Sequence, residues 1–342
     1  MDDHEAIALT NWLEAMCRHC DLGTLKAKPV PVSGGLLHRM FHVTTGKGDY
    51  AVKILNPAIM ARPEAIRNTI LSDQIARQLA GLIPASTARL SGGQSVLTFA
   101  DRSFMLFDWL DGRSILPPRI TTAHCGAIGR ILGLIHQADI TVECVVRQPA
   151  HRPPYDWPFF LGEAEKQQVD WLPPLREAVP QLIRWDQQSM NGKRIISDDQ
   201  VISHRDLDPK NVLWQGDQPW LIDWEAAGYI NPRQELVEVI NYWTIGPDGH
   251  YDPERLNALY HAYTQSIDCH GINWEPIFNC GYENMLGWLN YCLRLALGIE
   301  GHTLQERQLG EAQTRQTLTE LRDYESRSGD LLQWLRRTDI AL

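Results

Sequence analysis

Two short segments of the chain carry acidic and amide side chains whose types and spacing suit chemistry on a polar group. The first, at 204–211, reads HRDLDPKN and contains Asp206 and Asn211. The second, at 221–225, reads LIDWE, in which Asp223 follows an apolar, strand-like pair. A carboxylate can orient a hydroxyl group and accept its proton, while amide and carboxylate oxygens are the ligands that magnesium prefers. These residues predict a site in which a base works beside a divalent metal.

The order of these residues narrows the chemistry to phosphoryl transfer. His204-Arg205-Asp206 followed by Asn211 fits H-R-D-x-x-x-x-N, and Asp223 comes 17 residues after Asp206 (223 − 206). Phosphoryl transfer needs a base for the attacking hydroxyl and oxygen ligands for magnesium ions that bridge the phosphates. A loop beside a hairpin that delivers Asp223 would place all three groups on one side of a nucleotide. Asp, Pro and Asn also build ordinary turns, but the full match in order favours catalysis.

With these motifs the chain resembles the aminoglycoside phosphotransferase and choline kinase-like family, a branch of the protein kinase-like fold. The loop HRDLDPKN is also similar to that of the eukaryotic protein kinases. The resemblance implies an α+β, bilobal protein kinase-like fold, with a small antiparallel β-sheet lobe containing a helix and a larger, mainly helical lobe. It implies ATP and Mg²⁺ as cofactors, Asp206 as catalytic base, Asn211 and Asp223 as magnesium ligands, and His204 as the residue that holds the loop's shape.

The resemblance also implies a strand lysine upstream, which YAVKIL supplies as Lys53 to hold the α- and β-phosphates. A lysine within an apolar strand is unfavourable unless a negative group pairs with it, and the family uses a carboxylate on the following helix. Asp73 is the predicted partner, because it comes 20 residues later (73 − 53) and shares an inward-facing helical stripe with Ile66. The family usually has Glu there, so Asp73 is a departure. Glu64, at the helix start, is the rival.

A glycine pair lies where the family has its phosphate-covering loop. The segment VSGGLLHRMFHV provides backbone amides near Ser33, Gly34 and Gly35 as candidates for phosphate contacts. It has only two glycines, and a plain hairpin turn explains them equally well.

The segment SFMLFDWLDG has the pattern of a last strand that runs into a hinge between lobes. The resemblance implies that adenine binds there through main-chain groups of Asp108 and Leu110, with Phe107 lining the back of the pocket. Simple packing at the end of a strand is compatible with the same residues.

The residues that recognise the acceptor stay open. Glu225 could support a metal or a cationic substrate, or it could be an acid held in a salt bridge. Acids in the helical lobe are candidates by location only, and solvated helix acids explain them better: Glu275, Glu283 and Glu300. Trp and Tyr side chains there could stack on a sugar ring, although aromatics in a helical lobe are mostly core.

The elements that must position these groups follow from apolar periodicity and turn residues. The pattern predicts a leading helix at 4–20, a meander of strands at 30–35, 40–45 and 50–55, and a helix at 63–79. A strand pair at 95–99 and 103–109 follows, and then helices at 122–136 and from 234 onward. A Pro-rich stretch, 149–174, separates the first long helix from the next block. The predicted organisation is an amino-terminal nucleotide-binding lobe at 1–107, a hinge at 108–112 and a helical catalytic and substrate-binding lobe at 113–342.

Composition bounds the class of protein. The chain has 342 residues, a formal net charge of −10 and 44% hydrophobic residues, which excludes a disordered or collagen-like chain. The acidic balance argues against a general nucleic-acid binder. No apolar run approaches the roughly 20 residues that cross a bilayer, and MDDHEAIALT is unlike a signal peptide. Seven scattered cysteines indicate reduced thiols, and the single CxxC lacks a second ligand pair for zinc. We expect a cytoplasmic protein without a membrane, nucleic-acid or obligate protein partner.

Three functions compete on this evidence. Protein kinases need a long activation segment ending in A-P-E, and nothing similar follows Asp223. A binding protein that has only the fold would usually lack one of the catalytic residues, and here Lys53, Asp206, Asn211 and Asp223 are all present. The preferred function is therefore phosphorylation of a small-molecule hydroxyl. An aminoglycoside is the first candidate acceptor, with choline or ethanolamine, a hydroxy amino acid or a sugar as alternatives.

Overall fold

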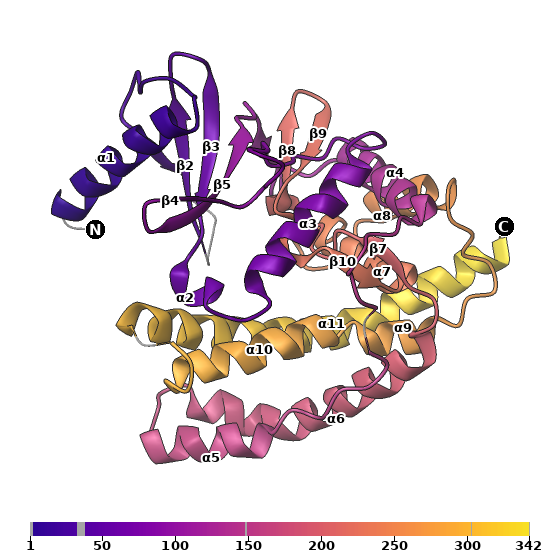
Figure 1. The fold of residues 1–342 in the computed structure, drawn as a ribbon. Coiled ribbons are helices and arrows are strands. Elements are labelled where there is room, and N and C mark those ends of the chain that lie inside the picture. Colours follow the sequence, from indigo (N-terminus) through magenta and orange to yellow (C-terminus); the bar gives the residue numbers. More distant parts are fainter. Residues whose placement is uncertain (1–2, 33–37, 148, 302, 342) are drawn as a thin grey trace. The chain divides into compact units, whose positions relative to one another are not determined.

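The helices and strands of the protein group into two compact units. We analysed a computed structural model that describes residues 3–32, 38–147, 149–301 and 303–341 (Figure 1). Unit 1 comprises 1–127, 134–146 and 202–228, and unit 2 comprises 128–133, 147–201 and 229–342. The motifs that predict chemistry all fall within unit 1. The hinge at 108–112 and the lobe boundaries beside it stay predictions.

Unit 1 contains a five-stranded antiparallel sheet with the strand order β1-β2-β3-β5-β4. The strands are β1 Val30–Val32, β2 Arg39–Thr44, β3 Asp49–Ile54, β4 Leu97–Phe99 and β5 Arg102–Asp108. Each lies within two residues of its predicted position, except that the end of the first predicted strand falls outside the described residues. The sheet, together with the helices of both units, confirms the predicted α+β class.

One face of this sheet is covered by helix α1, Asp3–His19. Apolar side chains of α1, such as Leu13 and Met16, form one core cluster with strand residues that include Val52 and Ile54. Because side chains alternate between the faces of a strand, Lys53 lies on the opposite face from α1. Its cross-strand neighbours there are Met40 and Met105.

Helices α2, Pro57–Met60, and α3, Ala65–Leu79, follow the third strand. The buried face of α3 consists of Thr69, Ser72, Asp73, Ile75, Ala76 and Leu79. The prediction that Ile66 shares the inward stripe with Asp73 is wrong, because the Ile66 residue is 42% exposed. The inward face is centred on smaller residues, which lets α3 pack closely against the 3₁₀ helix η2, Trp224–Ala226.

A second, three-stranded sheet carries the predicted catalytic segments of unit 1. It consists of β6 Arg113–Ser114, β8 Val212–Gln215 and β9 Gln218–Leu221 in the order β6-β8-β9. Strands β8 and β9 form a two-residue hairpin in which Gln215 pairs with Gln218. The 3₁₀ helix η1, Pro209–Asn211, precedes this hairpin and η2 follows it, so the two predicted catalytic segments flank one hairpin. The short strands β7, Val201–Ser203, and β10, Gly228–Ile230, bracket the whole segment.

Unit 2 is helical apart from the short strand ends at its borders. Its helices are α5 Trp157–Gln167, α6 Leu172–Ile196, α7 Pro232–Trp243, α8 Pro253–Thr264, α9 Trp274–Cys280, α10 Glu283–Ala296 and α11 Leu304–Ala341, and it holds the middle turns of α4 Thr122–Ala138. Within this unit α10 packs along α11, and α6 packs on α9. The Pro-rich stretch is not simply a separator, because α5 and the start of α6 lie within it. Prolines are tolerated there because they stand in the first turns of these helices.

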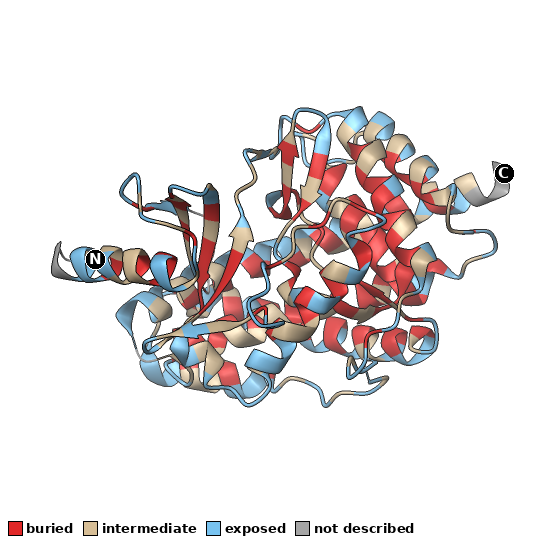
Figure 2. Ribbon diagram, turned by 45° about the horizontal axis from the view of Figure 1, so that its top comes forward, coloured by how far each residue is buried: buried red, intermediate tan, exposed pale blue. Residues whose placement is uncertain are grey.

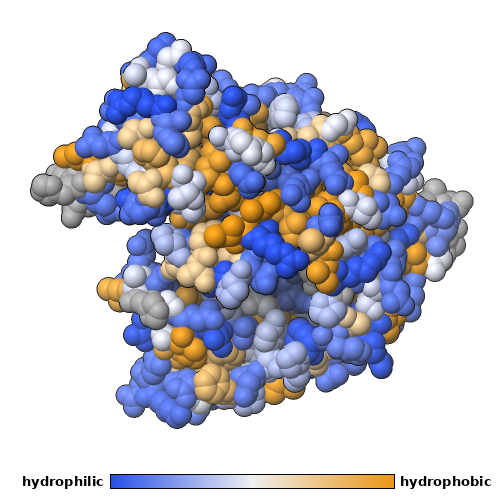
Figure 3. Space-filling model, viewed as in Figure 1, coloured by the Kyte–Doolittle hydropathy of each residue, from blue (hydrophilic) through white to orange (hydrophobic). Residues whose placement is uncertain are grey.

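Burial follows the expected amphipathic pattern. Buried residues are frequent along the strands and on one side of many helices, while exposed residues concentrate on loops and on the other sides of helices (Figure 2). On the face shown in Figure 3, hydrophilic side chains predominate and exposed apolar ones form smaller patches between them. Within the described residues no helix is both long and apolar enough to cross a membrane. All seven cysteines are described, and each is a free thiol.

Candidate active site

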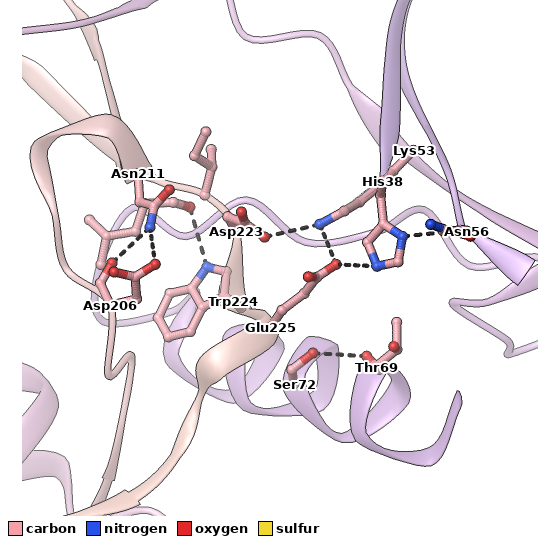
Figure 4. A network of polar contacts seen from close by, with 12 residues as sticks. His38, Lys53, Asn56, Thr69, Ser72, Asp206, Asn211, Asp223, Trp224 and Glu225 are labelled. Atoms are coloured by element: carbon pink, nitrogen blue, oxygen red, sulfur yellow. Dashed lines mark hydrogen bonds and ion pairs between the residues drawn. The ribbon is translucent and has the colours of Figure 1, made fainter. Parts of the chain in front are cut away.

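The loop after β7 joins the predicted base to the predicted metal ligand. The side-chain amide nitrogen of Asn211 donates to the main-chain oxygen of Asp206 at 2.9 Å and to its Oδ2 atom at 2.8 Å (Figure 4). Asn211 is buried, and Asp206 is partly exposed. Because the amide nitrogen makes both bonds, the amide oxygen of Asn211 is left for another partner. The loop therefore presents a carboxylate and an amide oxygen side by side.

His204 holds this loop against the strand segment that precedes Asp223. The ring is fully buried, its Nε2 lies 3.0 Å from the main-chain oxygen of Ile222, and its Nδ1 lies 3.3 Å from the main-chain nitrogen of Asp206. A carbonyl oxygen can only accept and an amide N–H can only donate, so Nε2 carries the proton. This neutral tautomer has both of its nitrogens in hydrogen bonds. The geometry agrees with a positioning role for His204.

Asp223 is placed by the β8–β9 hairpin and a strained backbone. It directly follows the segment after β9, and its backbone adopts a left-handed conformation with φ 58° and ψ 62°. Arg205, next to the predicted base, is also left-handed, with φ 65°. Non-glycine residues in this region cost about 1–3 kcal/mol each and tend to concentrate at functional sites. Two of the seven non-glycine residues with positive φ in the described part of the chain therefore flank this hairpin.

Lys53 reaches from the sheet to this segment and contacts two carboxylates. Its Nζ atom lies 2.9 Å from Asp223 Oδ1 and 2.5 Å from Glu225 Oε1 (Figure 4). Burial by itself lowers the pKa of Lys53, but the charges and hydrogen bonds of Asp223 and Glu225 outweigh it, so that the pKa is raised. Burial likewise raises the pKa of Asp223, and the nearby ammonium group of Lys53 overcomes this effect and lowers it. Both groups are therefore charged at neutral pH.

Glu225 receives a second contact, from His38. The His38 Nε2 atom lies 3.3 Å from Glu225 Oε1, and its Nδ1 accepts a hydrogen bond of 3.0 Å from the main-chain nitrogen of Asn56. Burial lowers the pKa of His38 although Glu225 acts in the opposite direction. The ring is thus neutral at pH 7, with its proton on Nε2. His38 precedes β2, Asn56 follows β3 and Glu225 belongs to η2. These contacts therefore link the three segments.

The predicted pair between Lys53 and Asp73 is not formed, and this corrects the sequence-based prediction. Both oxygens of Asp73 are used locally: Oδ1 accepts from the main-chain nitrogen of Ala88 at 2.7 Å, and Oδ2 accepts from Arg77 at 2.8 Å. Arg77 lies four residues on along the same helix face and is the nearer cation. The rival, Glu64, is exposed and pairs with Arg67. The carboxylate that the family places on α3 is supplied instead by Glu225.

Burial makes Asp206 an unusual carboxylate. Desolvation raises its pKa to about 6, with Asp208 and Asp223 acting in the same direction and Lys210 opposing them. The Lys210 Nζ atom lies 3.7 Å from Asp206 Oδ1 and 3.4 Å from Asp208 Oδ2. Lys210 was not identified from the sequence as a neighbour of the proposed base, although its position four residues after Asp206 was a signal that could have indicated it. Asp206 is thus a stronger base than an ordinary aspartate and remains ionised at pH 7.

The residues predicted around adenine have varied surroundings. Phe107 is partly buried and packs on a cluster formed by Leu55, Ala88 and Met105. Asp108 ends β5 and pairs with Arg89 at 2.6 Å, and Leu110 is half-buried just beyond. The proposed phosphate-loop residues Ser33, Gly34 and Gly35 lie outside the described residues.

The donor atoms suit a hard divalent cation. Asn211 offers an amide oxygen and Asp223 a carboxylate, and magnesium characteristically takes one or two protein oxygens and completes its shell with water and phosphate. A fully protein-built metal centre would look different. Among the residues that the structure describes, no group of three or more His, Cys, Asp or Glu side chains is arranged to hold a metal.

The fold is of the protein kinase-like type, and a family model gives the class of protein as a phosphotransferase. Residues 28–268 match the family model of the phosphotransferase enzyme family. The match covers more than half of the chain, so the chain belongs to this family. This confirms the resemblance drawn from HRDLDPKN and LIDWE, and it makes the chain an enzyme of phosphotransferase type.

Individual relatives lie at low identity. A homoserine kinase from Nitrobacter winogradskyi is 27% identical over 189 residues, 54% of this chain and 54% of that protein. A homoserine kinase from Methylobacterium nodulans is 25% identical over 238 residues, 68% of this chain and 69% of that protein. The chain thus spans about half the length of the first and about two thirds of the second. The structure of a spectinomycin phosphotransferase in complex with ADP and spectinomycin has a TM-score of 0.66 at 12% identity, covering 88% of this chain and 93% of that one. This last likeness shows the fold alone.

Proposed function

We propose that the chain transfers the γ-phosphoryl group of ATP to a hydroxyl group of a small molecule in a magnesium-dependent reaction. The observation that carries this proposal is a linked set of polar contacts within unit 1. Asn211 is bonded to Asp206, while Lys53 is bonded to Asp223. Base, metal ligands and phosphate-binding cation are thus held by the two elements that flank one hairpin and by the neighbouring sheet.

Asp206 is the proposed base. The acceptor oxygen forms a bond to the γ-phosphorus while the bond from that phosphorus to the β–γ bridging oxygen breaks, and the hydroxyl proton passes to the Asp206 carboxylate as ADP leaves. A base works best when its pKa approaches the working pH. The raised pKa of Asp206, about 6, fits this requirement better than the ordinary value of 3.8.

Lys53 is the proposed anchor for the α- and β-phosphates. Its ammonium group is buried and charged, so an incoming phosphate can replace Asp223 as its partner while Glu225 keeps the side chain in place. When bound, magnesium would neutralise phosphate charge, held by the oxygens of Asn211 and Asp223. Main-chain groups of Asp108 and Leu110, beside Phe107, remain the proposed adenine contacts, and the amides near Ser33, Gly34 and Gly35 the proposed phosphate loop.

The acceptor is proposed to be a hydroxy amino acid, with homoserine as the first candidate. This revises the order of candidates, because both relatives described above are named homoserine kinases. An aminoglycoside-like acceptor, the first candidate from sequence, becomes the second. Its support is the spectinomycin phosphotransferase, whose likeness extends to the fold alone.

A coupled assay of ADP release tests the proposal. Purified protein with ATP and Mg²⁺ is offered L-homoserine, L-serine, choline, ethanolamine and spectinomycin, with Asp206→Asn as the matched inactive variant. We expect acceptor-dependent ADP release that requires Mg²⁺ and is fastest with homoserine. Equal background rates for the two proteins across the panel would overturn the proposed activity. Faster turnover of spectinomycin than of homoserine would overturn only the choice of acceptor.

A further inference from the structure

Unit 2 contains a small polar cavity that the proposed phosphoryl-transfer site does not use. Its volume is about 120 Å³, and it is lined by the segment 149–152, by the carboxyl-terminal half of α6 and by the start of α10. Cavities of about 150 Å³ hold a molecule the size of benzene. The cavity, which is somewhat smaller, therefore suits a group of about five non-hydrogen atoms.

One face of α6 supplies Ser189 and Lys193 to the lining of the cavity, and Asp186 beside them pairs with Arg152 of the lining. Asp186, Ser189 and Lys193 stand at i, i+3 and i+7, so they share a face of the helix. All three are buried. Burial is uncommon for charged side chains such as Asp186 and Lys193 unless they are paired. Arg152 and Glu283 complete the set from the two neighbouring segments.

The four charged side chains form two ion pairs, which differ in how many of their hydrogen-bonding positions are used. Arg152 Nη2 lies 2.5 Å from Asp186 Oδ1, and Asp186 Oδ2 also accepts from the main-chain nitrogen of Tyr155 at 2.9 Å. This pair is well satisfied. Lys193 Nζ donates to Glu283 Oε2 at 3.0 Å, with side-chain exposures of 10% and 20%. An ammonium group has three donors and a carboxylate accepts several bonds, so both members of this second pair have unused capacity.

A buried hydroxyl group lies at the same cavity. The Ser189 residue is 1% exposed, it lines the cavity, and its Oγ atom has no hydrogen-bond partner within the described part of the chain. Buried polar atoms are normally satisfied, and each exception requires an explanation. A ligand that brings a donor or an acceptor would satisfy Ser189.

We propose that this cavity binds a small zwitterion, a molecule that carries both a carboxylate and an ammonium group. Asp186 does not line the cavity but neutralises Arg152, and Lys193 and Glu283 neutralise each other, so a ligand with a single charge would leave one charge at this buried site unbalanced, which is costly. A zwitterion keeps the balance: its carboxylate contacts Lys193 and its ammonium group contacts Glu283, with Ser189 bonded to either. The head group of an α-amino acid has this chemistry and this size.

The inference rests on the proposed function only for the choice of homoserine as the first probe. Binding is measured on the full chain without nucleotide, so phosphoryl transfer does not enter the result. A zwitterion that binds without being phosphorylated would leave this inference intact and remove homoserine as the acceptor. Phosphorylation of homoserine without binding of any zwitterion at the cavity would support the proposed function and overturn this inference.

Isothermal titration with matched ligands tests the requirement for two charges. L-homoserine is compared with 3-amino-1-propanol, which lacks the carboxylate, and with 4-hydroxybutanoate, which lacks the amine; glycine and L-serine serve as other zwitterions. We expect at least one zwitterion to bind, and single-charge analogues to bind at least about tenfold more weakly, the usual effect of losing one charged hydrogen bond. Absence of binding by every zwitterion, or equal binding of an analogue, would overturn the proposal.

Charge-neutral variants test the assignment to this cavity. Glu283→Gln should weaken zwitterion binding about tenfold and strengthen 4-hydroxybutanoate binding, whereas Lys193→Gln should shift preference toward 3-amino-1-propanol. A merely structural ion pair would not reverse ligand preference. Glu300→Gln is the matched control, because Glu300 forms an ion pair with Arg294 elsewhere in unit 2. Ser189→Ala, the variant least disruptive to folding, should also weaken zwitterion binding. Identical ligand profiles for Glu283→Gln and Glu300→Gln would overturn the assignment.

Discussion

At the scale of single residues, the proposed base is held in a state that suits chemistry better than stability. Asp206 is partly buried between its loop neighbours, and its carboxylate must be charged to accept a proton. Its pKa of about 6 lies above the ordinary value of 3.8, so the folded chain disfavours the charged form that catalysis requires. Such residues are where function and stability conflict.

Asp206→Asn should therefore inactivate the enzyme and stabilise it. Loss of a general base lowers turnover by about 10²–10⁴-fold. Without nucleotide or metal, the wild-type chain loses stability as pH rises from about 4 through 6, because its folded form binds the proton more tightly than its unfolded form. The variant lacks this loss. With the side chain 34% exposed, we expect a gain of about 1–2 kcal/mol above pH 6 and none below pH 4.

Urea unfolding of the two proteins at pH 4 and pH 7.5 measures this gain. Asp217→Asn serves as control, because Asp217 is an exposed acid in the β8–β9 turn of the same unit. An equal difference in stability at both pH values would contradict the raised pKa.

Substitution of Glu225 should lower activity, whereas substitution of Asp73 should lower stability. Glu225→Gln removes a charge from Lys53, so we expect kcat/KM for ATP to fall about 10–100-fold, in line with the loss of one charge-assisted contact. The pKa of Lys53 should also fall, which mass spectrometry would detect as faster acylation of its amine. Asp73→Asn keeps one oxygen that can accept from Ala88 but loses the charged bond to Arg77, so it should destabilise the fold by about 2 kcal/mol with near-normal kinetics. The opposite division would restore Asp73 as the partner of Lys53.

At the scale of elements, close backbone approach decides which sequences are tolerated. Gly310 of α11 faces α10, and a Cβ atom there would lie 2.6 Å from the Ala296 nitrogen and 2.7 Å from the Cys292 oxygen. Gly329 lies on the same helix, and a Cβ atom there would have no other described atom within 4 Å outside its own stretch of helix. The two glycines thus have the same helical backbone and different surroundings.

Alanine should have opposite effects at these two positions. Gly329→Ala should stabilise the chain by about 0.5–1 kcal/mol through helix propensity. Gly310→Ala should destabilise it by about 1–3 kcal/mol, because backbone atoms of α10 must move apart. Denaturant unfolding monitored by circular dichroism gives both values. A stabilising Gly310→Ala would mean that α10 and α11 pack less closely than the structure has them.

At the scale of the whole molecule, the two units hold different chemistry. Unit 1 contains Lys53, Asp206, Asn211 and Asp223, which are the groups proposed to act on ATP. Unit 2 contains the charge-balanced cavity beside Lys193. Binding to one unit can therefore be altered without touching residues of the other, and the two sites can be measured separately.

Nucleotide should stabilise the chain in a manner that depends on metal and on Asp223. At a concentration of about 100 times Kd, ATP with Mg²⁺ should add about 2.7 kcal/mol to the free energy of unfolding. EDTA should remove most of this increment, and Asp223→Asn should abolish its dependence on Mg²⁺ because a metal ligand is lost. Thermal unfolding with and without EDTA measures both. An increment in the variant that is still sensitive to Mg²⁺ would remove Asp223 from the metal site.

The sequence by itself determined the class of fold, and it predicted the catalytic segments. HRDLDPKN and LIDWE are each an unbroken stretch, and they lie close together in the sequence. The spacing along the chain therefore determines which of their groups can meet once β8 and β9 form a hairpin. The strands and α1 were also predictable, because their apolar periodicity is local. The contact between Lys53 and Glu225 was not, since Glu225 lies 172 residues away (225 − 53) and the choice depends on which carboxylate is already engaged.

Only the tertiary structure decided these long-range contacts. Arg77 occupies Asp73 because it stands one helical turn away, which leaves Glu225 to neutralise Lys53 and to contact His38. The cavity at Lys193 was equally beyond sequence reasoning, because its groups come from α6, α10 and an irregular segment. Periodicity reports which face of an element is buried, whereas charge pairing depends on distances between elements, and those distances exist only in the folded chain.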